Sequence, residues 1–155
     1  MTRILILSII LSGCTKLYYI NNKTSNNQPV SLMFYKGSAI TANDHRFSRY
    51  SGSKVIHNFE VAENDSCKGY QFQLIPNTKI SLSELVNMRS PQANQGFQIC
   101  LRGQCEVFPY PPQAQHAVLT KSFLLWKVYE IQIKETGSKN IIAVDSTGTH
   151  GTIQF

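Results

Sequence analysis

The chain has 155 residues, only 15% of them charged, and its 15 Lys and Arg residues outnumber the 9 Asp and Glu residues. This length suits one domain with a sizeable hydrophobic core, and the low charge content argues against disorder driven by charge repulsion. The basic residues are scattered, which argues against nucleic-acid binding and favours anionic lipids, cell-wall polymers or an acidic protein as partners.

The first fourteen residues combine a positive charge, a short apolar run and two small residues before a cysteine. Arg3 is the only charge, residues 4–11 are apolar except for Ser8, and Leu11-Ser-Gly-Cys14 follows. As a helix the run would reach about 12 Å, against roughly 30 Å for the hydrocarbon core of a bilayer, so it is too short to span one. The order of these features resembles the signal peptide and lipobox of bacterial lipoproteins.

The resemblance implies cleavage before Cys14 and acylation of this cysteine, which becomes the membrane anchor. Thr15, not Asp, follows it. By the same resemblance, this implies the outer membrane, with the domain facing the periplasm. The predicted organisation is a signal peptide over residues 1–13, a lipidated cysteine and polar tether over 14–29, and one β-rich domain over 30–155. The alternatives are an ordinary secretory signal and a buried N-terminal strand with a plain cysteine.

Within the tether, residues 17–20 are apolar and fit either a short first strand or a segment lying on the membrane. The next predicted strand covers residues 30–36 and ends at Gly37. Residues 55–61 place apolar side chains on one face together with His57, which we expect to be half-buried. Residues 70–74 alternate aromatic or apolar residues with glutamine, the pattern of a half-buried strand.

The loop over residues 38–54 is the candidate binding surface. It interleaves basic and aromatic side chains: His45, Arg46, Phe47, Arg49, Tyr50 and Lys54. Such combinations can bind glycans or polyanions, and long loops often carry binding sites. The alternative is a solvated loop whose aromatic side chains pack onto the core.

A short helix is predicted over residues 82–89, because Ser81 and Glu84 have the spacing of a capping box before an apolar stretch. A strand through Ile80 and Leu82 is the alternative. Residues 97–108 are predicted to form a hairpin, with Arg102 and Gly103 as its two-residue turn.

Four cysteines occur in the chain, and lipidation would consume Cys14. The predicted hairpin places Cys100 opposite Cys105 at a non-hydrogen-bonded position, where the Cα atoms lie about 4.5 Å apart. In an oxidising compartment this predicts a Cys100–Cys105 disulfide, with Cys67 free and buried. The alternative pairs Cys67 with one of the other two.

Residues 109–112, Pro-Tyr-Pro-Pro, predict an extended connection. Residues 122–134 form the strongest predicted strand, apolar on both faces in its first half, as expected for a central strand covered on both sides. Short strands over 141–144 and 152–155 follow, and the first could pair back as a hairpin. Seven or eight short strands and at most one short helix predict an all-β, β-dominated domain, either a small sandwich or a barrel.

The sequence lacks the spacings that mark common catalytic sites, including G-x-S-x-G, H-E-x-x-H and the P-loop. The cysteine spacing is not C-x-x-C, and no histidine is near the cysteines in sequence, so we predict no metal and no cofactor. The predicted function is a lipid-anchored binding module that attaches to the membrane through Cys14. It would bind an envelope protein through loops 38–54 or 109–117, and no nucleic acid. The alternatives are an inhibitor or immunity protein against a cell-envelope enzyme or toxin, and a cell-wall or glycan-acting enzyme.

Overall fold

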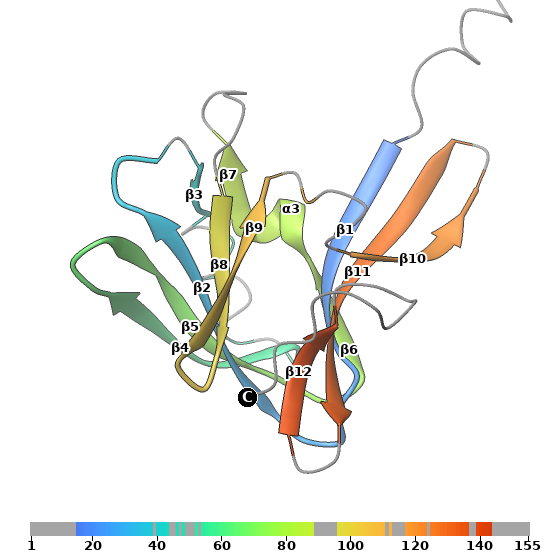
Figure 1. The fold of residues 1–155 in the computed structure, drawn as a ribbon, viewed down its shortest axis with the longest axis horizontal. Helices are drawn as coiled ribbons and strands as arrows, with labels where there is room; N and C mark the ends of the chain where they lie inside the picture. The colour runs from blue at the N-terminus through green and yellow to red at the C-terminus, as the bar shows by residue number, and fades with distance from the viewer. Residues whose placement is uncertain are drawn as a thin grey trace, which may run out of the picture.

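The computed structural model describes residues 15–38, 40–43, 46, 48, 52, 54–88, 96–110, 112, 117–123, 125–136 and 139–143. These residues form two five-stranded β-sheets that pack face to face as a small all-β sandwich (Figure 1). A two-stranded sheet and one four-residue helix complete the described part. Among the described residues, no helix is long and apolar enough to cross a bilayer.

The first sheet contains strands from both the start and the end of the described chain. Its strands are β1 (Thr15–Asn22), β6 (Thr78–Ser81), β10 (Val118–Ser122), β11 (Trp126–Thr136) and β12 (Lys139–Ala143). The order is β10–β11–β1–β6, and β12 also pairs with β11. β1 runs parallel to β11 from the pair Thr15 and Trp126 to the pair Asn22 and Ile133. Because β1 occupies one edge of β11, the hairpin partners β10 and β12 lie one after the other along its second edge.

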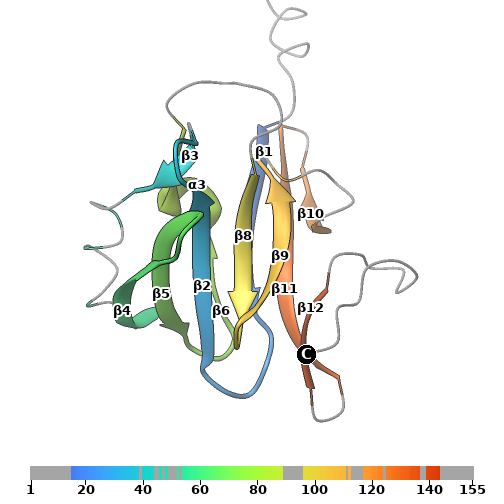
Figure 2. The same ribbon diagram turned by 60° about the vertical axis from the view of Figure 1, so that its left-hand side comes forward.

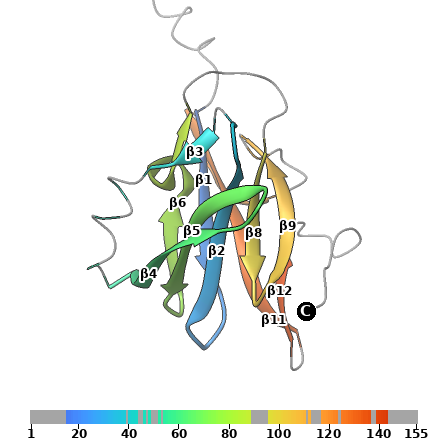
Figure 3. The same ribbon diagram turned by 90° about the vertical axis from the view of Figure 1, so that its left-hand side faces the viewer.

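The second sheet is antiparallel throughout, with the order β4–β5–β2–β8–β9. Its strands are β2 (Gln28–Tyr35), β4 (Ile56–Glu63), β5 (Cys67–Leu74), β8 (Gly96–Leu101) and β9 (Gln104–Pro109). Figure 2 shows it as a layer beside β1 and β11, and Figure 3 looks onto β5, β2, β8 and β9. The small sheet pairs β3 (Ile40–Ala42) with β7 (Val86–Met88), which follows the helix α3 (Leu82–Leu85).

The main core fills the space between the sheets. Ile20 and Ile131 from the first sheet meet Leu32, Phe72 and Phe97 from the second in one cluster, each fully buried. Burying side chains of this size contributes about 1.5–3 kcal/mol each. A smaller cluster of Met33, Cys67 and Cys100 lies apart from this core, on residues whose register places them on the outer face of the second sheet.

The hairpin prediction is confirmed. Cys100 pairs with Cys105 and Leu101 with Gln104, around a turn in which Arg102 and Gly103 have φ of 51° and 85°. Cys100 and Cys105 form the disulfide, with their Cα atoms 3.9 Å apart, and Cys67 is free and buried. The all-β class is confirmed as well, and the fold is the sandwich of the two predicted alternatives.

The predicted tether is wrong over residues 15–22, because these residues form β1 in the middle of the first sheet. Ile20 is fully buried there, and Thr24 and Gln28 are buried shortly after it. The described sandwich therefore already includes Thr15, well before residue 30. Apolar residues 17–20 were the sequence signal for this strand. Its parallel partner, β11, lies more than a hundred residues further along the chain.

Four further details differ from the prediction. The helix is limited to α3, and the Ser81 side chain makes no capping hydrogen bond. Residues 122–134 are not one strand but the end of β10, a turn and most of β11, which leaves Phe123 exposed. His57 is exposed because a bulge between His57 and Glu60, with Asn58 at a φ of 51°, breaks the alternation of β4. The two main sheets also contain more strands than the seven or eight predicted.

Candidate functional site

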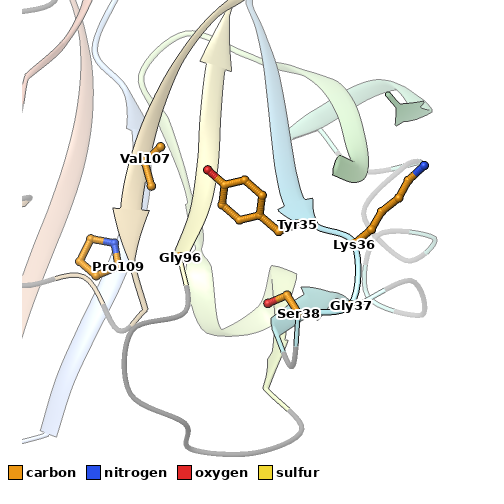
Figure 4. Close-up of a pocket in the computed structure, with 7 residues that line it drawn as sticks. All are labelled: Tyr35, Lys36, Gly37, Ser38, Gly96, Val107 and Pro109. Atoms are coloured by element: carbon orange, nitrogen blue, oxygen red, sulfur yellow. The ribbon is translucent and has the colours of Figure 1, made fainter. Parts of the chain in front are cut away.

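A candidate pocket among the described residues lies on the outer face of the second sheet, where β2 ends and β8 begins. The register pairs Phe34 with Phe97 and Gly96 with Pro109, so the end of β2 and the end of β9 lie on either side of the start of β8. The pocket is open and has a volume of about 530 Å³. Its lining residues are Tyr35, Lys36, Gly37, Ser38, Gly96, Val107 and Pro109 (Figure 4).

Tyr35 provides the aromatic surface of the pocket. Its ring extends from the end of β2 across β8, toward Val107 (Figure 4). Gln98 Nε2 donates a hydrogen bond of 2.9 Å to the Tyr35 hydroxyl. The side chain is 41% exposed, and Val107 on the neighbouring strand is 53% exposed. The ring is thus held at both ends while much of its surface remains available to a partner.

Gly96 forms the floor of the pocket, at a point where two strands approach closely. A Cβ atom built on Gly96 would lie 2.8 Å from the backbone oxygen of Phe108, closer than real Cβ contacts allow. A larger residue would push β9 away and would crowd the Val107 side chain, whose Cγ1 atom lies 3.4 Å from the same Cβ position. Glycine at this position keeps both the strand pairing and the pocket.

An ion pair stands at the rim of the pocket. Lys36 Nζ lies 2.9 Å from Glu63 Oε1, and both side chains are about half exposed. The pKa of Glu63 is lowered mainly by the hydrogen bond from Lys36 and, as the second cause, by the positive charge of Lys36. An exposed pair of this kind contributes little to stability, and the Lys36 side chain extends away from Tyr35 and Val107 (Figure 4). The surface of the pocket is therefore mainly that of Tyr35, Val107 and Pro109, which suits an apolar or aromatic group.

A second polar cluster surrounds Glu130 on the first sheet. The buried carboxylate accepts hydrogen bonds from Asn21 Nδ2 at 2.7 Å, Lys79 Nζ at 3.2 Å and Gln132 Nε2 at 3.3 Å. Burial raises the pKa of Glu130, but these donors and the Lys79 charge outweigh it and lower the pKa below its usual range. Both oxygens have donors, so the cluster fixes β1, β6 and β11 to one another.

The structure places the predicted binding loop only in part. Of its six candidate residues, Arg46 and Lys54 are described, whereas His45, Phe47, Arg49 and Tyr50 lie outside the described residues. Arg46 is half-buried and its backbone N–H donates to Asn43 O at 2.9 Å, while Lys54 is exposed. The binding surface on loop 38–54 remains a prediction.

Cys14 and the predicted signal peptide also lie outside the described residues, as do residues 152–155. The second predicted binding loop, 109–117, is described at Pro109, Tyr110, Pro112 and Ala117. Pro109 lines the pocket, so the structure brings the first residue of this loop and the first residue of loop 38–54, Ser38, to one site.

Five residues of the pocket were not predicted from the sequence: Tyr35, Lys36, Gly37, Gly96 and Val107. Tyr35 falls in a predicted strand and Val107 in a predicted hairpin, and nothing in their spacing shows that they share a face. The available signals were Gly37, which follows β2 with a φ of 80°, and Gly96, which begins β8. Gly37 marks the positive φ after β2 and Gly96 a close approach to β9, but neither glycine identifies the side chains that line the pocket.

The comparisons with known proteins found no match for this chain. No protein-family model, no curated protein and no solved structure matches this chain. Within the described residues, no group of three or more His, Cys, Asp or Glu side chains is arranged to hold a metal ion.

Proposed function

We propose that this chain is a lipid-anchored bacterial outer-membrane protein whose periplasmic sandwich domain binds an envelope protein through the pocket around Tyr35. The observation that carries the proposal is the exposed Tyr35 ring, held across β8 by its hydrogen bond with Gln98. Aromatic side chains in such settings supply most of the binding energy at protein interfaces.

Preorganisation makes this pocket suited to a protein partner. Tyr35 and Val107 lie on strands of one sheet, so little conformational entropy is lost when a partner covers them. Pro109 adds a rigid apolar wall. A tyrosine ring presents a large apolar face with a polar end, which fits a mixed surface.

The proposed anchor is supported by the order of features in residues 1–14: one Arg, a short apolar run and Leu-Ser-Gly-Cys. Acylation of Cys14 would fix the domain to the membrane by its first strand, because β1 starts at the next residue, Thr15. Two or more acyl chains are enough for stable attachment.

The experiment compares partner capture by the acylated wild-type protein and by Tyr35→Ala, using chemical crosslinking in cells followed by affinity purification. We expect the principal crosslinked protein to be lost, with affinity reduced about tenfold or more, as for a central aromatic contact. Tyr35→Phe keeps the ring and should retain most binding. Gln73→Ala, a partly buried position on β5 away from the pocket, is the matched control.

Unchanged capture by Tyr35→Ala, at an unchanged melting temperature, would show that the pocket is not the binding surface. Recovery of only abundant outer-membrane proteins by the wild type would contradict a specific partner. A captured cell-envelope hydrolase that loses activity on binding would assign the protein to the inhibitors within this proposal.

A further inference from the structure

An exposed apolar cluster forms the tip of the β10–β11 hairpin. Phe123, Leu125 and Trp126 are 46%, 58% and 37% exposed. The Phe123 and Trp126 rings stack with their centroids 3.9 Å apart, and Phe123 N donates to Trp126 O at 2.8 Å to close the turn. Exposed large apolar side chains are common singly, but a stacked pair with a leucine at one tip marks an interaction surface.

The tip lies beside the start of the described chain. Thr15 N donates a hydrogen bond of 3.0 Å to Leu125 O, and Thr15 pairs with Trp126 in the parallel register of β1 and β11. A groove of about 380 Å³ between them is lined by Thr15, Leu17, Leu125 and Trp126. Figure 1 shows the start of β1 next to this end of the hairpin. Residue 14, the proposed anchor, is therefore one peptide bond from a residue that contacts the tip.

Lysines stand directly behind the apolar tip. Lys16 and Lys127 are neighbours in the register of β1 and β11, and Lys121 is exposed on β10 opposite Val128. Like charges at directly paired positions of a sheet are destabilising in water. An anionic surface would reverse this cost, because lysines within a Debye length of acidic headgroups are attracted to them.

We propose that the β10–β11 tip inserts into the interfacial layer of an anionic bilayer. Phe123, Leu125 and Trp126 enter the boundary between headgroups and acyl chains, and Lys16, Lys121 and Lys127 contact acidic headgroups. Aromatic and leucine side chains backed by lysines are the composition of interfacial membrane contacts. The inference deepens the proposed anchoring at Cys14, on which it rests: the acyl chains hold the domain at the membrane, and the tip fixes its orientation.

Trp126 allows a direct test, because it is the only tryptophan in the chain. The acylated protein is reconstituted into vesicles of phosphatidylglycerol and phosphatidylcholine, and acylation is verified by mass spectrometry. We expect the Trp126 emission to shift to shorter wavelength and to be quenched by lipids brominated near the top of the acyl chains. Quenching should be weaker with bromine near the terminal methyl, since the tip is interfacial and does not span.

Two variants separate the apolar and the charged contributions. Phe123→Ser with Leu125→Ser keeps Trp126 as the reporter and should lose both the shift and the quenching. Lys16→Gln, Lys121→Gln and Lys127→Gln together should lower quenching in anionic vesicles to the value in neutral ones. Lys68→Gln, an exposed lysine on β5 of the other sheet, is the matched control and should behave as wild type. Far-ultraviolet circular dichroism verifies folding of each variant.

The outcomes distinguish this inference from the anchor itself. An acylated protein whose Trp126 is neither shifted nor quenched overturns the tip contact and leaves the anchor in place. A chain without acyl groups overturns the anchor, and quenching of its Trp126 would still support the tip contact. Shielding of Trp126 that depends on protein concentration and not on lipid would show contact between two copies of the chain and would overturn the inference.

Discussion

At the scale of single residues, two glutamates in the same sandwich have opposite electrostatic environments. Glu130 is buried but accepts hydrogen bonds from Asn21, Lys79 and Gln132, which lower its pKa. Glu106, on β9, is half-buried, and its Oε2 is buried without a hydrogen-bond partner in the described structure. Burial raises the pKa of Glu106 to about 7. Both occur in alternating strand sequences, so only their neighbours in space distinguish them.

Glu106→Gln should change how stability depends on pH. The pKa of Glu106 is about 7 in the folded state, against an ordinary value of 4.5 for a glutamate exposed to water. Its protonated form favours folding, so the wild type has this stability in full below about pH 4.5 and loses it as pH rises through about 7. Above pH 8 the variant should be more stable than wild type by about 1 kcal/mol, a value reduced to allow for solvent screening of a half-exposed group.

The measurement is urea unfolding of both proteins from pH 4.5 to pH 8.5. The difference between the two unfolding free energies should grow across this window, because all other titrating groups are shared. A constant difference would show that Glu106 titrates at its ordinary pKa in the folded protein.

At the scale of elements, the β8–β9 hairpin is specified twice, by its turn and by its disulfide. Arg102 and Gly103 both have positive φ, the requirement for a two-residue turn that matches the twist of paired strands. Glycine meets this requirement without strain and arginine does so at a cost. Cys100 and Cys105 close a covalent ring across the same register. This hairpin contributes Val107 and Gly96 to the pocket, so its rigidity supports the binding surface.

Replacement of both cysteines, Cys100→Ser with Cys105→Ser, should lower the free energy of unfolding by about 2 kcal/mol. The bond closes a short loop, so the entropy that it removes from the unfolded chain is small. Denaturant unfolding of wild type, with and without a reducing agent, measures the effect. The reducing agent should lower wild-type stability by a similar amount and leave the double variant unchanged. Equal stability of reduced and oxidised wild type would contradict this role.

At the scale of the whole molecule, the two sheets are joined by hydrogen bonds as well as by the apolar core. Asn22, the fully buried last residue of β1, donates from Nδ2 to Leu74 O on β5 at 2.8 Å and to Asn26 O at 2.9 Å. Its Oδ1 accepts from the backbone N–H and the hydroxyl of Thr24. One side chain therefore connects the first sheet, the second sheet and the turn between them.

Asn22→Ala should lower the free energy of unfolding by about 2–3 kcal/mol, because the Leu74 carbonyl and the Thr24 N–H would lose their partner in a buried site. Asn26→Ala is the matched control, since the Asn26 side chain is exposed while its carbonyl remains in place; its effect should stay within about 0.5 kcal/mol. Thermal or urea unfolding measures both. Equal destabilisation by the two substitutions would show that the buried hydrogen bonds of Asn22 do not account for the loss of stability.

The sequence alone determined the features that depend on neighbouring residues. Two-residue alternation predicted β5, and the run over residues 30–36 ended by Gly37 predicted β2. The Arg102-Gly103 turn predicted the β8–β9 register and hence the Cys100–Cys105 bond. These features depend on side-chain direction and turn geometry, which are local properties of the chain. Alternation failed at His57 because the bulge in β4 changes the direction of the side chains that follow.

Only the tertiary structure decided which strands lie next to one another. The pairing of β1 with β11 turned a predicted tether into a central strand, and it placed Thr15 beside Leu125 and Trp126. The pocket around Tyr35 required β2, β8 and β9 to share one outer face. Distant pairing depends on how apolar faces are buried across the whole molecule, and residues far apart in sequence leave no spacing from which it can be read.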